Sequence, residues 1–336
     1  MTLRTALIGY GLAGRVIHRP LLDAVPDLTV THVVSANPAR RAEASHDLPW
    51  AELVGTADEL WSHVDDFDVV VVATTNDVHV PLATTALDLG KAVVVDKPLA
   101  LTSAAAADLV AHAAGRPLSV FHNRRWDSDT LTAAQLIADG TLGAVHRLEA
   151  RFTRFRPQVQ QRWREQPGSG GVLLDLGTHL VDQAVHLLGP VASVYAEVRH
   201  QRAGAVVDDD CFLSLTHASG ASSLLWCSAT APWAGPRLVL QGSAAGWVKQ
   251  DLDGQEDAQR RGVPQQPEPP GSLWDQDGER DVPSLQGGWA AYYRAFAEAV
   301  TTGGPMPVDP ADGVEVLRVL EAGATSSARG EVVHLR

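Results

Sequence analysis

The sequence predicts an α/β fold in two parts: a doubly wound parallel sheet, then an α+β region with a large, open, mostly antiparallel sheet. Strand-like apolar runs alternate with helical patterns as far as residue 121. From Arg147 onward, short alternating strands separated by turn residues dominate instead. We therefore expect one domain over residues 1–121 and a second over residues 122–336, whose C-terminal helices pack back on the first.

Length and composition limit the classes of protein to consider. The chain has 336 residues, which is enough for about two domains. An excess of 40 acidic over 27 basic residues gives a net charge of −13, which argues against a nucleic-acid partner. Cys211 and Cys227 are too few for a disulfide framework or a structural zinc site, and we expect both in one sheet. Without a long apolar run or a secretory signal, we expect a cytoplasmic protein with no membrane partner.

A glycine-rich turn follows the first predicted strand, Thr5–Ile8. The apolar period becomes helical after it, from Val16 to Leu22. In this context a Gly-x-Gly-x-x-Gly pattern binds the pyrophosphate of a dinucleotide, which makes the first domain a Rossmann domain. The alternative is a glycine-rich turn without a ligand. The cofactor contacts predicted here are Gly9, Tyr10, Gly11, Leu12, Ala13 and Gly14.

The end of the second predicted strand, Leu28–Val34, indicates which dinucleotide binds. An NAD site usually places Asp or Glu here for the ribose 2′-hydroxyl. The segment 35–41 has no carboxylate, and a serine and two arginines stand there instead. These groups can bind a 2′-phosphate, so we expect NADP, with Ser35, Asn37 and Arg40 as contacts. The alternative is a solvated basic start to a helix.

Two more strands of this domain, Asp68–Ala73 and Val93–Val95, end in polar residues. The carboxyl ends of parallel strands line the cofactor crevice, so we expect these residues there. A lysine at the end of an interior strand is costly to bury and indicates chemistry, the alternative being a solvated loop lysine. The residues are Thr74, Thr75, Asn76, His79, Asp96, Lys97 and Pro98.

The segment that leaves the first domain carries many hydrogen-bond donors and one indole, which suits a polyol pocket at a domain junction. The alternative is an interdomain salt-bridge network. After a predicted helix over Leu131–Ala138 and a strand over Arg147–Phe155, we expect Trp163 and Arg164 near the nicotinamide ribose or the substrate. A surface turn is the alternative for those two. The substrate contacts predicted from these segments are His122, Asn123, Arg124, Trp126 and Phe155.

A helical period over residues 173–188 places Asp175 and His179 on one face. Histidine is well matched to moving a proton near neutral pH, and a carboxylate one turn away can bind a hydroxyl or orient the imidazole. A lone histidine on such a helix would be structural. Its pairing with Asp175, in a chain that also has Lys97 at a strand end, favours catalysis.

The rest of the second domain is predicted to be a sheet followed by helices. Residues 254–288, rich in Pro, Gln, Gly and Asp, are interpreted as one long irregular loop. One face of the sheet is a candidate surface for a homo-oligomer. The predicted strands are Val191–Val198, Asp208–Leu215, Ala221–Ser228, Arg237–Gln241 and a short edge strand over Val332–Leu335, and the helices are Gly288–Thr301 and Pro310–Ala328.

Three segments, in this order, resemble the Gfo/Idh/MocA oxidoreductases, which are sugar and cyclitol dehydrogenases. They are the glycine turn, the Val-Ala-Thr-Thr-Asn-x-x-His segment at 72–79, and Asp96-Lys97-Pro98, where the family usually has Glu-Lys-Pro. The resemblance implies that Lys97, Asp175 and His179 converge on the carbinol carbon. Residues 122–127, 154–164 and 253–258 are similar to one subgroup, the NADP-dependent scyllo-inositol 2-dehydrogenases.

We therefore predict an NADP-dependent oxidoreductase that transfers a hydride between nicotinamide and a secondary alcohol or ketone of a cyclitol or sugar. The best candidate reaction is scyllo-inositol to 2-keto-myo-inositol (scyllo-inosose). His179 would be the general base in oxidation, Lys97 would stabilise the reacting oxygen, Asp175 would orient the ring, and no metal is required. The alternatives are a keto-sugar or imine reductase of the same fold, and a non-catalytic NADP-binding redox sensor. We expect a homo-oligomer, a dimer or tetramer formed through the second sheet.

Overall fold

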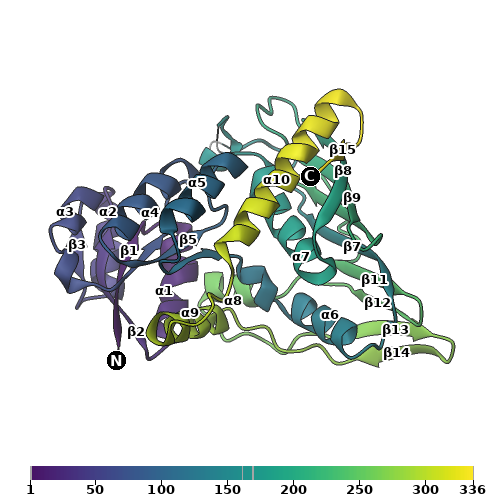
Figure 1. The fold of residues 1–336 in the computed structure, drawn as a ribbon, viewed down its shortest axis with the longest axis horizontal. Coiled ribbons are helices and arrows are strands. Elements are labelled where there is room, and N and C mark those ends of the chain that lie inside the picture. Colours follow the sequence, from purple (N-terminus) through teal and green to yellow (C-terminus); the bar gives the residue numbers. More distant parts are fainter. Residues whose placement is uncertain (1, 161, 169, 336) are drawn as a thin grey trace. The chain divides into compact units, whose positions relative to one another are not determined.

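The computed structural model describes residues 2–160, 162–168 and 170–335 (Figure 1). The described chain divides into two compact units. The domain limits at residues 121 and 122 stay a prediction. The first unit comprises Met1–Asn123, Gln255–Gln265 and Trp289–Val314, and the second comprises Arg124–Gly254, Gln266–Gly288 and Glu315–Arg336.

The first unit contains the predicted doubly wound sheet, six parallel strands in the order β3-β2-β1-β4-β5-β6. Runs of valine form its central strands, and Val69–Val72 is fully buried because helices cover both faces. The strand order reverses its direction between β1 and β4. Because crossovers between parallel strands are right-handed, the helices that connect β1, β2 and β3 lie on the opposite face of the sheet from those that connect β4, β5 and β6. The strands are β1 (Leu3–Ile8), β2 (Leu28–Val34), β3 (Glu52–Val54), β4 (Val69–Val72), β5 (Ala92–Asp96) and β6 (Leu118–Phe121).

Capping side chains fix where several helices of this unit begin. Asn37 caps α2, Thr56 forms a capping box with Glu59 at α3, and Thr102 caps α5. The helix predicted after the glycine turn begins as a π-helix, η1, before it continues as α1. The helices are η1 (Leu12–His18), α1 (Arg19–Asp23), α2 (Pro38–Asp47), α3 (Ala57–Trp61), η2 (Val64–Asp66), η3 (Asn76–Val78), α4 (His79–Asp88), α5 (Ser103–Ala113), α8 (Gln255–Arg261) and α9 (Ala290–Thr302).

The second unit contains a nine-stranded sheet in the order β14-β13-β12-β11-β7-β10-β9-β8-β15. Among its described strands only β7 and β10 pair in parallel, which confirms a mostly antiparallel sheet. Cys211 and Cys227 are buried register partners on β9 and β10, as predicted. The strands are β7 (Val145–Thr153), β8 (Val191–Arg199), β9 (Asp210–His217), β10 (Ser222–Ser228), β11 (Leu238–Gly242), β12 (Gly246–Lys249), β13 (Gly271–Asp275), β14 (Gly278–Val282) and β15 (Val333–His334).

Helices α6 and α7 lie on one side of this sheet (Figure 1), and α7 contacts β7 and β10. The predicted helix over 173–188 is a short π-helix, η6, followed directly by α7. The remaining helices are η4 (Asn123–Trp126), α6 (Ser128–Ala138), η5 (Trp163–Glu165), η6 (Leu173–Gly177), α7 (Thr178–Leu188) and α10 (Pro310–Arg329), of which η4 and α10 each contribute residues to both units.

The prediction of one irregular loop over residues 254–288 is wrong. The segment forms helix α8 and a hairpin of β13 and β14, which pair from Gly271 to Val282. β14 is exposed over Gly278–Asp281 and has no apolar alternation, so its strand pairing is invisible in the sequence. The hairpin extends the sheet over part of the segment that was predicted to be an irregular loop.

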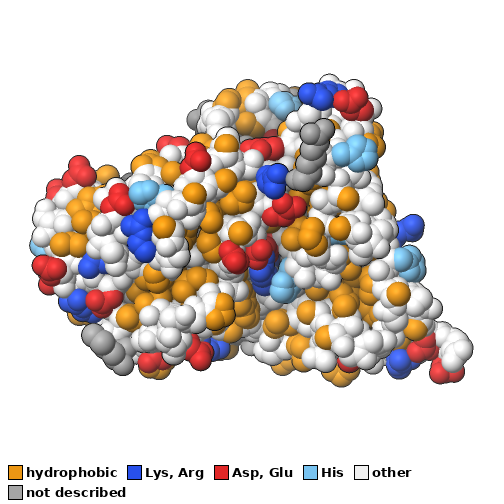
Figure 2. Space-filling model, in the orientation of Figure 1, with side chains coloured by type: hydrophobic (Ala, Val, Ile, Leu, Met, Phe, Trp, Pro, Cys, Tyr) orange, Lys and Arg blue, Asp and Glu red, His pale blue; other side chains and the backbone are white. Residues whose placement is uncertain are grey.

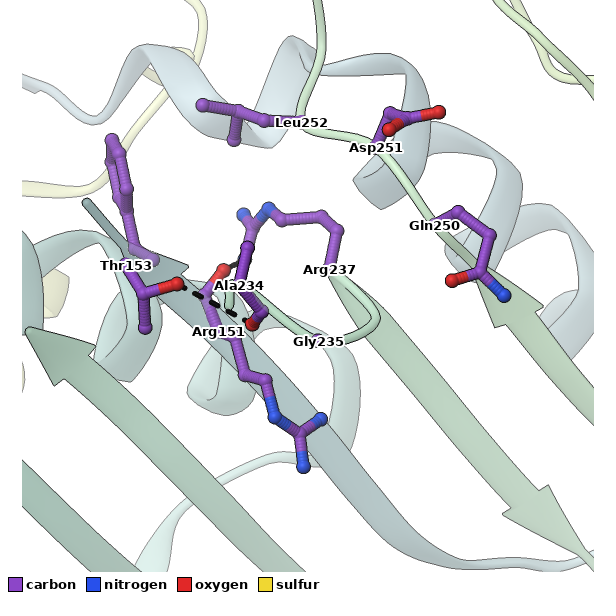
Figure 3. A pocket seen from close by; sticks show the side chains of 9 residues that line it. Arg151, Thr153, Ala234, Gly235, Arg237, Gln250, Asp251 and Leu252 are labelled. Atoms are coloured by element: carbon purple, nitrogen blue, oxygen red, sulfur yellow. Dashed lines mark hydrogen bonds between the residues drawn. The ribbon is translucent and has the colours of Figure 1, made fainter. Parts of the chain in front are cut away.

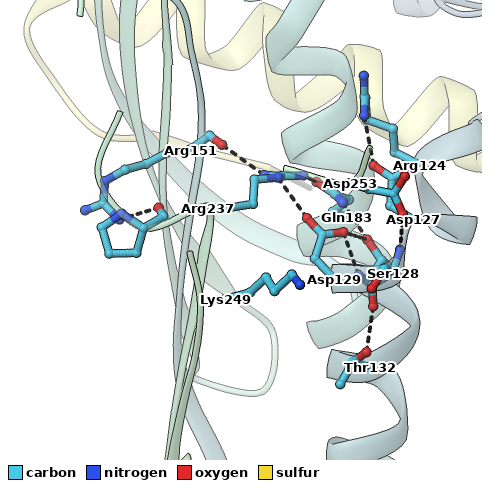
Figure 4. A network of polar contacts seen from close by, with 12 residues as sticks. Arg124, Asp127, Ser128, Asp129, Thr132, Arg151, Gln183, Arg237, Lys249 and Asp253 are labelled. Carbon is cyan, nitrogen blue, oxygen red and sulfur yellow. Dashed lines mark hydrogen bonds and ion pairs between the residues drawn. The ribbon is translucent and has the colours of Figure 1, made fainter. Parts of the chain in front are cut away.

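A buried ionic network anchors α6 to the second sheet (Figure 4). The Arg237 guanidinium forms an ion pair of 2.8 Å with Asp129 and donates a 2.6 Å hydrogen bond to the Gln183 side chain. The Asp253 carboxylate accepts a 2.7 Å hydrogen bond from the backbone N–H of Ser128 at the start of the helix. Because these charges are buried, removing one partner would leave the other uncompensated.

Charged side chains of both signs are interspersed on the face shown in Figure 2, and that face has no large basic patch. This agrees with the net charge of −13. Among the described residues, no helix has both the length and the apolar character needed to cross a bilayer.

Candidate active site

The glycine turn of the first unit forms a tight cradle at the point where the strand order reverses. Gly9 has a φ of +102°, and a Cβ built on it would lie 2.4 Å from the carbonyl oxygen of Ala73 after β4. A Cβ on Gly14 would lie 1.9 Å from the carbonyl oxygen of Gly9. Both positions therefore require glycine, and the cradle fits the pyrophosphate of a dinucleotide, which needs this close approach of the backbone.

The other residues of the turn are Tyr10, Leu12 and Ala13, and their contacts with a cofactor stay predictions. The Tyr10 side chain is 1% exposed and its hydroxyl donates a 3.1 Å hydrogen bond to Asp47. Burial and this carboxylate raise the pKa of Tyr10. Only the backbone of Tyr10 is therefore available to contact a cofactor. Leu12 is exposed and, with Ala13, begins η1.

Ser35 directly follows β2, and the Arg40 side chain extends from α2 to the glycine turn. Arg40 lies over the glycine cradle, with its Nη1 3.4 Å from the position of a Cβ on Gly11. Arg41 turns away and donates a 2.6 Å hydrogen bond to the backbone carbonyl of Ser35. The Asn37 side-chain oxygen caps α2 by accepting from the N–H groups of Ala39 and Arg40, and its contact with a cofactor stays a prediction.

A buried histidine joins the ends of β4 and β5. The His79 Nδ1 lies 2.9 Å from the Pro98 carbonyl oxygen, and its Nε2 lies 3.4 Å from the Thr74 carbonyl oxygen. Burial lowers the pKa of His79, which favours the neutral ring. A neutral imidazole has one N–H, so His79 donates to only one of these two carbonyl oxygens, and the contact with Pro98 is the shorter. Of its neighbours, Thr75 is exposed and Asn76 is buried at the start of η3.

Lys97 directly follows β5, and its peptide bond to Pro98 is cis. Asp96 accepts a 2.8 Å hydrogen bond from the Lys97 N–H, and its other oxygen lies 3.8 Å from the Nε2 of His18. Burial raises the pKa of Asp96, but its contact with His18 and the charge of Lys97 outweigh this, so the net pKa is lowered. The carboxylate beside Lys97 is therefore ionised near neutral pH.

A tyrosine that sequence reasoning missed completes this arrangement. The Tyr293 hydroxyl on α9 lies 2.6 Å from the Nδ1 of His18, and both side chains are buried against Phe121. His18 and Tyr293 are 275 positions apart, so no local pattern connects them. The structure thus supplies a buried polar chain from α9 through η1 to the end of β5.

The segment after β6 divides between the two units. His122 and Asn123 are buried in the first unit. In the second unit, the Arg124 guanidinium forms a buried 2.9 Å ion pair with Asp127 and lies 4.6 Å from the centre of the Phe152 ring. One of the donor groups predicted for a polyol, the Arg124 guanidinium, is therefore paired with a protein carboxylate. The Trp126 carbonyl accepts a hydrogen bond from Gly288.

The second unit brings Trp163, Arg164 and Asp175 together, with His179 four residues after Asp175. The Arg164 Nε lies 3.4 Å from the Asp175 carboxylate, and its guanidinium lies 4.3 Å from the centre of the Trp163 ring. His179 lies one helical turn after Asp175, and the centre of its ring lies 6.0 Å from the centre of the Phe152 ring. Gln161, which precedes Trp163, and Ser169, which lies between Arg164 and Asp175 in the sequence, are outside the described residues. The arrangement presents a carboxylate, an imidazole and a cation from neighbouring segments.

Two further features of the second unit are an exposed aromatic side chain and a pocket. Phe155 follows β7, is 58% exposed and forms an isolated bridge with Thr230. Figure 3 shows a pocket beside β7 that Arg151, Thr153 and Arg237 help to line. The pocket contains none of the predicted catalytic residues, so it is not the candidate active site.

A glycine cradle at the switch point of a doubly wound sheet and a lysine at a neighbouring strand end define a class: oxidoreductases with a nicotinamide-dinucleotide domain. Comparison with protein families agrees. Residues 3–123 match the oxidoreductase family's NAD-binding Rossmann fold, and residues 134–335 match its C-terminal α/β domain. The chain therefore belongs to the Gfo/Idh/MocA family, as predicted.

Two similar proteins cover nearly the whole chain, and a third covers part of it. The scyllo-inositol 2-dehydrogenase (NADP(+)) IolW of Bacillus subtilis is 34% identical over 99% of this chain and 96% of its own length. The solved structure of the oxidoreductase yvaA from Bacillus subtilis has a TM-score of 0.93 at 33% identity, and covers 100% of this chain and 99% of its own. A dTDP-3,4-didehydro-2,6-dideoxy-alpha-D-glucose 3-reductase of Streptomyces antibioticus is 34% identical over 59% of this chain and 61% of its own length.

Proposed function

We propose that this chain is an NADP-dependent enzyme that transfers a hydride between nicotinamide and a secondary alcohol or ketone of a cyclitol or sugar, in the cytoplasm. The leading pair is scyllo-inositol and 2-keto-myo-inositol. The observation that carries the proposal is the position of Lys97 at the carboxyl end of β5. Strand β5 is a neighbour of β4, whose end contacts the glycine cradle that follows β1. The name of the Bacillus subtilis relative supports both the cofactor and the substrate.

The cofactor would be held by residues of the first unit. The backbone of Gly9, Gly11 and Gly14 would bind the pyrophosphate, and Ser35 and Arg40 would bind the 2′-phosphate. When bound, NADP supplies the hydride acceptor for oxidation, and NADPH supplies the donor for reduction. The remaining contacts that we propose are Thr74, Thr75, Asn76, Pro98, Trp163 and Arg164.

The chain's own residues would manage charge and protons at the reacting carbon. The Lys97 ammonium would stabilise negative charge that develops on the substrate oxygen. His179 would take the hydroxyl proton in oxidation and return it in reduction. Asp175 would bind a neighbouring hydroxyl, with Arg164 holding its carboxylate in place. The further substrate contacts that we propose are His122, Asn123, Trp126 and Phe155.

A panel of polyols tests the reaction. Purified protein is incubated with scyllo-inositol, myo-inositol and common sugars, each with NADP⁺ and with NAD⁺, while the absorbance of reduced nicotinamide is followed. We expect turnover with scyllo-inositol and NADP⁺. The absence of turnover with every polyol and both cofactors, in protein that binds NADPH, would instead favour the redox sensor.

Replacement of Lys97 tests its role. Lys97→Met keeps the length of the side chain but removes the charge, so we expect a loss in kcat of about 100-fold or more. NADPH affinity, measured by fluorescence, is expected to change little. Wild-type turnover in Lys97→Met would exclude the proposed role.

A second candidate is reduction of a nucleotide-linked keto-sugar, which the Streptomyces antibioticus relative favours. Consumption of NADPH with a dTDP-linked keto-sugar, at a higher kcat/KM than with 2-keto-myo-inositol, would select it.

We also propose that copies of the chain associate through the open face of the second sheet. That face carries Phe212 and Trp226, with ring centres 5.2 Å apart, and the Arg151 guanidinium lies 4.0 Å from the Trp226 ring centre. Light scattering after size-exclusion chromatography measures the mass, and Trp226→Glu should lower it to that of one chain.

A further inference from the structure

We propose that the first unit carries a binding site for a first-row divalent metal ion such as Zn²⁺, formed by His32, His63 and Asp66, with the Glu52 carboxylate beside the two histidines. One potential ligand atom each from His32, His63 and Asp66 lies within 4.8 Å of the other two. This site is independent of the glycine cradle and of Lys97, and it does not rest on the proposed reaction.

Three separate segments bring these groups together. His32 on β2 and Glu52 on β3 are register partners in neighbouring parallel strands, so their side chains leave the sheet side by side. His63 lies between α3 and η2, and Asp66 is the last residue of η2. The rings of His32 and His63 are 5.7 Å apart, and the Glu52 carboxylate lies between them, 3.5 Å from the Nε2 of each.

The buried His32 ring is the observation that points to a ligand. The residue is 3% exposed, and its Nε2 has no hydrogen-bond partner among the described residues. Its Nδ1 lies 3.0 Å from the Thr31 hydroxyl. If Nδ1 carries the proton and donates it to Thr31, the lone pair is on Nε2 and is directed into the cluster. A second group that fixes the tautomer of a histidine in this way is typical of metal-binding histidines.

The spacing of the donor atoms fits a small ion. Zn²⁺ bonds of about 2.0–2.1 Å place tetrahedral ligands roughly 3.3–3.4 Å apart. The two separations from Glu52 are 3.5 Å, and both involve a histidine Nε2. The other nitrogen of His63, Nδ1, lies 3.8 Å from Asp66. A histidine ring gives only one nitrogen to an ion, so with His63 the ion takes either the Glu52 oxygen or the Asp66 oxygen at these separations. Two imidazoles favour zinc, nickel, cobalt or copper over magnesium and calcium, which prefer oxygen ligands.

The site is open to solvent on one side. The side chains of His63, Glu52 and Asp66 are 34%, 50% and 62% exposed, whereas that of His32 is 4% exposed. An ion can therefore enter from solvent and reach the buried nitrogen. Once bound, it would join β2, β3 and the α3–η2 connection, and would stabilise the edge of the first sheet.

Calorimetry and thermal unfolding of the full chain, after removal of metal with EDTA, test the site with Zn²⁺, Co²⁺ and Mg²⁺. We expect one Zn²⁺ per chain and, at a hundredfold excess over Kd, a rise in Tm of about 5–10 °C. Co²⁺ should give the intense visible absorption of a tetrahedral site, and Mg²⁺ should have no effect. An equal response to Mg²⁺, or no binding of Zn²⁺, would overturn the proposal.

Variants locate the bound ion. His63→Ala, at a partly exposed position, should weaken Zn²⁺ binding by at least tenfold. The matched control is His112→Ala, which removes another partly exposed histidine of the same unit and should leave Zn²⁺ affinity unchanged. His32→Asn should also weaken binding, and an unchanged Kd for NADPH shows that this variant is folded. Unchanged Zn²⁺ affinity in His63→Ala, or equal losses in His63→Ala and His112→Ala, would exclude the site.

Discussion

Replacement of Arg40 by alanine should change which cofactor the protein prefers. The Arg40 guanidinium lies over Gly11, whereas the neighbouring Arg41 binds the backbone carbonyl of Ser35. Asn37 caps α2 and hydrogen-bonds the N–H of Arg40, so the backbone from which this side chain extends is fixed. In the proposed NADP complex, Arg40 would bind the phosphate on the adenosine ribose, and NADH has no such phosphate.

The size of the effect follows from one charge-assisted hydrogen-bonded pair. A hydrogen bond to a charged group contributes about 1.5–3 kcal/mol, and 1.4 kcal/mol corresponds to a factor of about ten. Arg40→Ala should therefore raise the Kd for NADPH by about 10- to 150-fold. Arg40 is exposed, so added salt should reduce the difference.

Fluorescence titration with NADPH and NADH at two salt concentrations measures the four dissociation constants. Arg41→Ala is the matched comparison, because it removes an adjacent guanidinium that binds Ser35 instead. We expect Arg41→Ala to affect both cofactors equally and Arg40→Ala to affect NADPH far more. Equal weakening of the two cofactors by Arg40→Ala would refute the assignment of NADP through this residue.

Three further changes test the surrounding structure. Gly14→Ala should abolish NADPH binding, because its Cβ would lie 1.9 Å from a carbonyl oxygen. Gly90→Ala is the control: Gly90 has a φ of +74° and open space around it, so this change should lower the free energy of unfolding by about 1–2 kcal/mol and leave the Kd for NADPH unchanged. Tyr293→Phe should lower the free energy of unfolding in urea by about 1–3 kcal/mol, because the buried His18 Nδ1 loses its partner; no loss would mean that the ring is satisfied otherwise. Burial lowers the pKa of His217 below its ordinary 6.5, so its contribution to stability is present above that pH and is lost as pH falls; the decline in Tm between about pH 7 and pH 5 should be shallower in His217→Gln, and equal slopes would contradict this.

Much of the first sheet could be predicted because its signals are local. The valines of β4 and β5 are continuous apolar runs, and the glycines directly follow β1. Lys97 was identified because a strand ends beside it. In contrast, β3 has only three residues, and the pairing of β14 depends on backbone hydrogen bonds to β13, so neither has an apolar pattern.

Contacts between distant segments could not be predicted. The pairing of His18 with Tyr293 depends on how α9 packs on the first sheet, and the pairing of Arg164 with Asp175 depends on how a loop lies against η6. The ion pairs of Arg124 with Asp127 and of Arg237 with Asp129 could not be predicted either, because they also depend on how the chain packs. Residue type alone showed that these groups need partners but not which carboxylate each one meets.

The return of α9 to the first unit limits how the enzyme can be dissected. Its tyrosines cover Phe121 and His18, so a fragment that stops after β6 would leave an apolar surface and a buried imidazole open to water. Such a truncated protein should aggregate instead of binding nucleotide. Each half of this molecule is encoded in interleaved pieces, and neither can be cut out as a contiguous gene fragment.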